Sequence, residues 1–237
     1  MTTYRPRPER LLLLRQLVTA AENAYNVAAK TVEAKTIVDT YVGEYEDSTR
    51  ADYWTNIYES AYDYLTSSGA VTRYKNAARR AIVESFPTAF YSGYADAGGE
   101  ETEDEDESWL TARMNKELGF VDALFMSLRE LRESEGFDKD SADAQASERA
   151  DGYRATLDSV YAEGKLRGAG NLALTWRLGA TEKHCSTCSG LDGQRHGAKW
   201  WLKKGYKPRE PGSETLECRG FNCDCILEDD KGNEYTI

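Results

Sequence analysis

The sequence predicts a mainly α-helical protein of the α+β class, in which a helical body precedes a small C-terminal region with a short β-hairpin. Apolar residues recur at helical spacing through the first two thirds of the chain. From Leu172 onward, glycine, proline and tryptophan become frequent and the helical periodicity fades. All five cysteines lie in this last part of the chain. Because the region has few aliphatic residues for a core of its own, we expect a bound metal ion to staple it together.

Three helices are expected in the first part of the chain. The first runs from about Glu9 to about Tyr41, because its apolar residues are spaced alternately three and four apart. The second, from Ser48 to Leu65, is rich in Tyr and Trp. The third runs from about Ala70 to Ala97, and Pro87 is expected to kink or split it because proline lacks an amide donor.

An acidic run, Glu100 to Glu107, separates these helices from the next pair and holds seven carboxylates in eight residues. We expect a solvated loop whose last carboxylates favour the positive N-terminus of the following helix. A mimic of nucleic acid or a cation sink is the alternative. A helix with an apolar seam from Leu110 to Leu128 follows, Ser134 to Asp140 ends it, and another helix is expected from about Ala142 to about Arg167.

Glycines recur in two of these helices, in segments around Gly93 and Gly164 that resemble each other. Small residues one helical turn apart let a second backbone approach closely, so we expect helix packing there. These glycines do not follow a strand, which argues against a phosphate-binding loop.

Composition restricts the function classes. An apolar content of 40% and a charged content of 30% suit a soluble globular protein of 237 residues. The net charge of −11 argues against non-specific nucleic-acid binding. No apolar run is long enough to span a membrane. A local basic stretch from Arg195 to Arg209 is nevertheless present, although the net charge of the chain is negative. Met1 to Arg10 is polar, so no secretory segment is expected to open the chain.

The cysteines form two clusters, Cys185-x-x-Cys188 and Cys218-x4-Cys223-x-Cys225. A thiolate pair two residues apart can hold one tetrahedral soft cation, and a second cluster can complete its coordination. Disulfides and free thiols are the competing interpretations. Five is an odd number, however, and the first pair is too close in sequence to staple a long loop. We therefore expect one structural zinc ion with four of the five cysteines as ligands.

The thiolate-rich composition favours a closed structural site over a catalytic site with an open position. One ligand set comprises Cys185, Cys188, Cys223 and Cys225, and in others Cys218 replaces one of the last two. His184 is adjacent and can also ligate, but we expect it to be a solvated loop residue, as we do His196.

The segment from Arg149 to Leu227 carries an ordered series of motifs. A helix is followed by a tryptophan, a cysteine knuckle, a Leu-x-Gly and a terminal Cys-x-Cys. The series reads Tyr153…Tyr161-x2-Gly164…Gly168, Trp176…His184-Cys185-x-Thr187-Cys188, Leu191-Asp192-Gly193, Trp200 or Trp201, Gly205, Pro208, and Leu216-Glu217-Cys218-x-Gly220-x-x-Cys223-x-Cys225-x-Leu227. It resembles the C-terminal region of phage minor head proteins of the Mu-like head-morphogenesis family. Many members place a His-Pro pair before the final Cys-x-Cys, which suggests that Cys218 substitutes for a histidine ligand here.

The resemblance implies a minor virion protein that acts in head assembly at or near the portal, inside or at the base of the capsid, after assembly in the host cytoplasm. Its expected partners are the portal protein, the major capsid protein or both, with no membrane involved. The chain then divides into an N-terminal helical region (1–99), the acidic linker (100–107), the helical part of the head-morphogenesis-like domain (108–180) and a zinc-binding region (181–237). The resemblance supplies no catalytic residues, so we do not expect an enzyme.

Two further interpretations stay open. One is a zinc-dependent hydrolase or nuclease carried in the virion, with His184, His196 and Asp192 around an open metal. The other is contact with packaged DNA, in which tryptophans stack on bases beside basic residues. The residues expected to make such contacts are Lys199, Lys203, Lys204, Lys207 and Arg209, with Trp200 and Trp201. The simpler expectation is that both tryptophans pack this region onto the helices.

Overall fold

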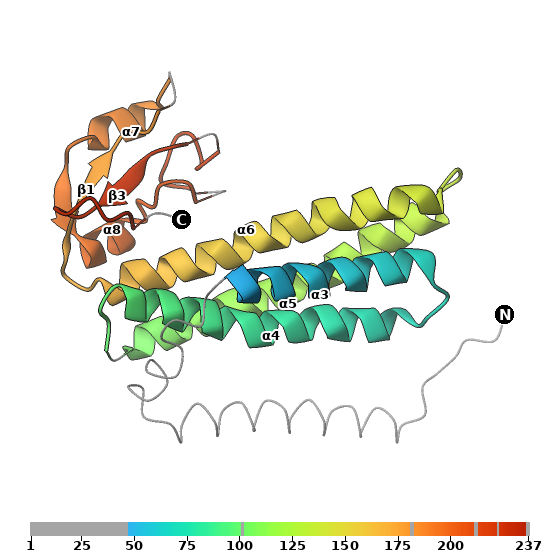
Figure 1. Cartoon of the computed structure of the whole chain (residues 1–237). Coiled ribbons are helices and arrows are strands. Elements are labelled where there is room, and N and C mark those ends of the chain that lie inside the picture. Colours follow the sequence, from blue (N-terminus) through green and yellow to red (C-terminus); the bar gives the residue numbers. More distant parts are fainter. Residues whose placement is uncertain (1–46, 101, 181–182, 211–212, 222, 236–237) are drawn as a thin grey trace.

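The protein is mainly α-helical, with a small antiparallel sheet and a cysteine cluster near its C-terminus. The structure, a computed structural model, describes residues 47–100, 102–180, 183–210, 213–221 and 223–235. The helix expected from Glu9 to Tyr41 lies outside these residues. In the described part of the chain, four long helices form the body, and the elements that follow the last of them form a knob at one end of it (Figure 1). These helices are α3 (Asp47–Thr66), α4 (Val71–Asp96), α5 (Asp104–Glu133) and α6 (Ala142–Gly168).

The body is a helical bundle (Figure 1), and α4 and α6 make the most extensive contact within it. Glycines allow this approach: a Cβ atom built on Gly93 would lie 2.1 Å from the Tyr161 carbonyl oxygen, and one on Gly164 would lie 2.1 Å from that of Phe90. The expectation that these glycines serve helix packing is confirmed. The one-turn 3-10 helix η1 (Lys139–Ser141) joins α5 to α6.

Pro87 does not split the third expected helix, because α4 continues from Val71 to Asp96. Phe86, Ala89 and Phe90 are fully buried around the proline, so apolar packing holds both sides of it in one helix. The carbonyl that loses its donor is that of Val83, whose side chain is exposed.

The acidic run is not a loop over its whole length. Asp104 to Glu107 form the first turn of α5, and Glu103 caps the helix. The Asp106 side chain accepts a hydrogen bond from the Glu103 amide at 3.0 Å, in a reciprocal capping box. Carboxylates favour this position because the first amides of a helix carry partial positive charge. The expected preference of the last carboxylates for a helix N-terminus is therefore confirmed.

The knob contains a three-stranded antiparallel sheet in the order β2-β1-β3. Its elements are β1 (Ala173–Arg177), α7 (Ser186–Leu191), β2 (Arg195–Gly197), α8 (Ala198–Lys204) and β3 (Ile226–Glu228). In register, Leu174 pairs with His196 and Trp176 pairs with Leu227. The expected C-terminal hairpin is present as β3, a turn at residues 229–232 and a single bridge between Glu228 and Glu234.

The knob has a hydrophobic cluster separate from that of the body. Trp176 and Trp201 lie at its centre with no exposed surface, and their ring centroids are 5.8 Å apart. The small number of aliphatic residues in this region predicted that it has no core of its own. That prediction underestimated the two tryptophans, which bury more apolar area than aliphatic side chains do. Trp201 Nε1 donates to the Leu174 carbonyl at 3.1 Å, which satisfies the polar atom of its ring.

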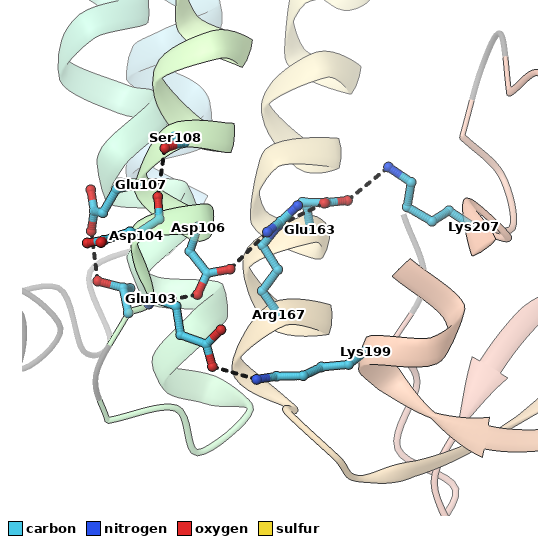
Figure 2. A network of polar contacts seen from close by, with 10 residues as sticks. Glu103, Asp104, Asp106, Glu107, Ser108, Glu163, Arg167, Lys199 and Lys207 are labelled. Atoms are coloured by element: carbon cyan, nitrogen blue, oxygen red, sulfur yellow. Dashed lines mark hydrogen bonds and ion pairs between the residues drawn. The ribbon is translucent and has the colours of Figure 1, made fainter. Parts of the chain in front are cut away.

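A buried ionic network joins the knob to the body (Figure 2). Arg167 of α6 contacts Asp106 at 2.8 Å and Glu163 at 2.9 Å. Glu163 also contacts Lys207 of the knob at 3.1 Å. Burial alone lowers the pKa of Lys207, but the carboxylates of Glu163 and Glu210 outweigh it and raise that pKa above its ordinary value. Ion pairs between the knob and the body, which together form the junction, thus hold the two parts against each other.

Candidate metal centre

All five cysteines converge in the knob, and together they can bind a metal ion. Cys185 caps α7 and Cys188 lies in its first turn. Cys218 comes from a turn after α8, and Cys223 and Cys225 come from the segment that leads into β3. Cys188, Cys223 and Cys225 are buried, whereas Cys185 and Cys218 are half-buried. Each of the five is a free thiol, so the structure does not support the disulfide alternative.

The separations between sulfur atoms are those of a metal site. Cys188 Sγ lies 4.0 Å from Cys218 Sγ and 3.9 Å from Cys223 Sγ. Zinc–sulfur bonds of about 2.3 Å in a tetrahedron place neighbouring sulfur atoms about 3.8 Å apart. A disulfide would instead need about 2.05 Å between them. Small side-chain adjustments are therefore enough for Cys188 to share a soft cation with either neighbour.

Local backbone structure holds the first cysteine pair. Cys185 is the N-cap residue of α7, and its sulfur accepts a hydrogen bond from the Cys188 amide at 3.4 Å. An amide that points at a sulfur atom stabilises the thiolate, which is the form that binds metal. The Cys-x-x-Cys spacing therefore gives a turn in which the Cys185 sulfur already accepts a hydrogen bond from the backbone.

Two glycines bring the cysteine loops together, and the sequence analysis gave neither this role. A Cβ atom on Gly179 would lie 2.1 Å from the Asp224 carbonyl oxygen, between Cys223 and Cys225. One on Gly220 would lie 1.9 Å from the Glu210 carbonyl oxygen, and Gly220 has a φ of 74°. The spacing of Gly220 after Cys218 was visible in the sequence, but the backbone that it contacts was not.

The thiols differ in their protonation equilibria. Burial raises the pKa of the Cys188 thiol, and its hydrogen bond with Cys185 raises it further. Burial also raises the pKa of Cys223, but hydrogen bonds from backbone amides outweigh it and leave that pKa below the ordinary value. The same balance of burial against backbone hydrogen bonds lowers the pKa of Cys185. Cys185 and Cys223 are thus the sulfur atoms that deprotonate most readily.

The two histidines lie in different environments. His184 is half-buried, and its Nδ1 lies 3.9 Å from Cys225 Sγ. The expectation of a solvated loop residue therefore does not describe His184, which borders the cysteine cluster. His196 lies in β2, and its ring stacks on Trp200 at 3.7 Å.

The residues expected for an open catalytic metal do not come together. Asp192 Oδ1 accepts a hydrogen bond from the Leu178 amide at 3.2 Å. Within the described part of the chain, the groups of three or more side chains close enough to hold a metal consist of cysteines. The structure thus places His184 near the sulfur atoms and groups neither His196 nor Asp192 with it.

Most of the basic residues expected to face DNA are engaged within the protein. Lys199 contacts Glu103 at 2.5 Å, Lys207 is held by Glu163 and Glu210, and Arg209 contacts Glu234 at 3.1 Å. Lys203 and Lys204 make no ion pair with the described residues. Trp201 is fully buried, while Trp200 is half-buried against His196. The two tryptophans therefore do not form a free stacking surface. Trp201 packs inside the knob, against Trp176 and the Leu174 carbonyl.

Comparisons with protein-family models, curated protein sequences and solved structures gave no match to this chain. None of the helices in the described ranges is long and apolar enough to cross a membrane.

Proposed function

We propose that this protein is a structural component of a tailed-phage head, acting in assembly at or near the portal. The resemblance of residues 149–227 to the Mu-like head-morphogenesis family supports this proposal. The observation that carries it is the position of the motif residues in the fold. Trp176, Leu191, Trp201, Leu216 and Leu227 are all buried in the knob, where they form its core.

The motif glycines have structural roles as well. Gly193 and Gly205 adopt φ values of 74° and 68°, which favour glycine. Gly205 ends α8 in a left-handed conformation, and Gly193 follows α7 before β2. The motif residues thus form the core of the knob, end a helix and bring thiols together. These are the roles expected in a folded docking module. They are not the roles of a set of reacting groups.

Zinc is the ion that fits the cluster best. Thiolates prefer soft or borderline cations, and buried thiolate-rich sites are typical of structural zinc. One zinc ion on four of the five cysteines would suffice to link α7, the turn at Cys218 and the segment before β3. The ion would then stabilise the knob directly, because the loops that carry its ligands have little other regular structure.

The proposed partners are the portal protein and the major capsid protein, within the virion and without a membrane. Of the basic residues expected to contact packaged DNA, Lys203 and Lys204 are the proposed contacts. The other three, Lys199, Lys207 and Arg209, already pair with carboxylates. Such contact would be weak and strongly salt-dependent, since few phosphates are neutralised. A zinc-dependent hydrolase or nuclease carried in the virion is the alternative. It requires an open position beside a base.

The protein inventory of purified particles tests the virion role. We expect the chain in mature heads at low copy number and cross-linked to portal or capsid protein. A Cys188→Ser variant should be lost from heads, whereas Gly152→Ala, at an exposed position on α6, should be retained. Absence of the chain from purified particles would contradict the proposal. Zinc-dependent turnover of DNA, peptide or cell-wall substrate that His184→Ala abolishes would favour the enzyme alternative.

A further inference from the structure

The five sulfur atoms form two groups of three that share one member. Cys185, Cys188 and Cys218 make the outer group, and Cys188, Cys223 and Cys225 make the inner group. Within each group all sulfur atoms lie within 4.8 Å of one another. Cys188 belongs to both groups and lies between them.

A single ion held by four thiolates fits this arrangement poorly. A tetrahedral zinc with four thiolates needs every pair of sulfur atoms about 3.8 Å apart. Among the five cysteines, the groups that satisfy even a 4.8 Å limit contain three members. A fourth thiolate for either group would have to move in from the other group. Two ions that share one sulfur need no such movement, because only the shared sulfur must be close to both sets.

We propose that the cluster binds two soft metal ions bridged by the Cys188 thiolate. The inner ion lies on Cys188, Cys223 and Cys225, and the outer ion lies on Cys185, Cys188 and Cys218. This inference extends the proposed structural zinc from one ion to two, and it does not depend on a role in phage heads.

His184 supplies the fourth ligand of the inner ion. Its Nδ1 lies 3.9 Å from Cys225 Sγ, so a modest change of its side-chain torsions brings the nitrogen to the ion. Three thiolates and one imidazole form a common closed zinc site. The three inner cysteines are buried, which suits an ion that exchanges slowly.

The outer group differs in exposure. Cys185 and Cys218 are half-buried, so the fourth position of the outer ion is left to solvent. Charge also favours a second ion. Five thiolates with one dication leave a net charge of about −3, whereas two dications leave about −1, and buried uncompensated charge is costly. The outer ion is therefore the weaker and more exchangeable of the two.

Metal stoichiometry of the full-length protein tests the proposal. Reduced protein is saturated with zinc, freed of excess metal and analysed by native mass spectrometry and elemental analysis. We expect two zinc ions per chain. In a titration with Co²⁺, the thiolate charge-transfer absorption should keep rising up to the second equivalent. Saturation at one ion by both methods would overturn the proposal.

Variants assign the two sites. Cys185→Ser and Cys218→Ser should each reduce the count to one ion while the knob stays folded. His184→Ala should weaken inner-site zinc binding by more than about tenfold. His196→Ala is the matched control, because this histidine stacks on Trp200, and it should keep two ions. Two ions retained in Cys185→Ser would overturn the assignment.

A measurement on the wild-type protein loaded with cadmium avoids the problem that a variant can unfold. Cadmium NMR should show two resonances, one with a mixed sulfur and nitrogen environment. A single resonance would contradict the bridged pair. These outcomes are independent of whether the chain is found in purified heads, so the two proposals fail separately.

Discussion

At the scale of single residues, glycines decide how closely α4 and α6 approach. Gly93 and Gly164 contact backbone carbonyls of the opposite helix, and neither site has room for a Cβ atom. Gly168 does the same against the Tyr94 carbonyl oxygen, at 2.2 Å from its Cβ position. The recurrence of small residues in two helical segments predicted this contact. The partner carbonyls could not be predicted, because they depend on the register between the helices.

Replacing Gly164 by alanine should therefore destabilise the body. The new methyl group meets the Phe90 backbone, and overpacking of this kind costs about 1–3 kcal/mol. Gly152→Ala on the same helix is the control, because its Cβ atom meets nothing within 4 Å. Alanine should stabilise that position by up to about 1 kcal/mol through helix propensity. Denaturant unfolding measures both free energies, and equal effects would refute the close contact.

At the scale of elements, α5 carries a buried carboxylate in its apolar seam. Glu117 is only 4% exposed and occupies the face that Leu110, Met114 and Val121 share. Glu117 was not predicted to be buried, although its position three residues after Met114 and four before Val121 places it on the apolar face of the helix. Burial raises the pKa of Glu117, and the nearby Arg113, 3.2 Å away, only partly offsets this.

The raised pKa of Glu117 predicts how the free energy of unfolding changes with pH. Because the pKa of Glu117 is higher in the folded than in the unfolded protein, the folded protein binds the Glu117 proton more tightly. The stability of the fold therefore falls as pH rises from the ordinary pKa of 4.5 through the raised value. Glu117→Gln removes this dependence. The variant should be more stable than the wild type at neutral pH, and the difference should vanish below pH 4.5.

The exposed Glu130 on the same helix is the control for that measurement, because Glu130→Gln removes a carboxylate from α5 without removing a buried one. Thermal unfolding at several pH values gives both profiles. A neutral-pH loss of stability in Glu117→Gln would show that the ion pair with Arg113 outweighs the burial of the carboxylate.

At the scale of the whole molecule, the protein has two hydrophobic clusters with a charged junction between them. The long helices were predictable because periodicity over many turns identifies them. The sheet order was not predictable, since β2 and β3 have three residues each, too few to establish a period of two in the sequence. The convergence of the cysteines followed from their spacing. The pairing of Lys199 with Glu103 and of Lys207 with Glu163 did not, because these carboxylates lie far away in the sequence, at the N-cap of α5 and in α6.

Separate clusters predict separate unfolding when the metal site is lost. Cys188→Ser removes the central sulfur, so the knob should unfold while the four helices stay formed. Limited proteolysis should cleave after residue 172 and leave a resistant helical fragment. Tryptophan fluorescence should report exposure of Trp176 and Trp201, which are fully buried in the intact knob. Uniform resistance to protease, or loss of all helical signal, would contradict two independent clusters.

The junction itself should depend on the buried part of its ionic network and not on the exposed part. The Lys207 and Glu163 side chains are 13% and 2% exposed, whereas Lys199 and Glu103 are 50% and 61% exposed. Removing one partner of a buried pair leaves the other charge uncompensated. Lys207→Met should therefore cost about 2 kcal/mol in unfolding free energy, and Lys199→Met less than about 0.5 kcal/mol.

Unfolding of both variants at low and high salt completes the test of the junction. The Lys199→Met effect should disappear at high salt, because exposed pairs are screened. The Lys207→Met effect should persist, because solvent ions do not reach Glu163. Arg167 remains beside Glu163 in this variant, which keeps the loss below that of an isolated buried charge. Equal costs for the two lysines would mean that packing of α8 on α6, and not charge, seats the knob.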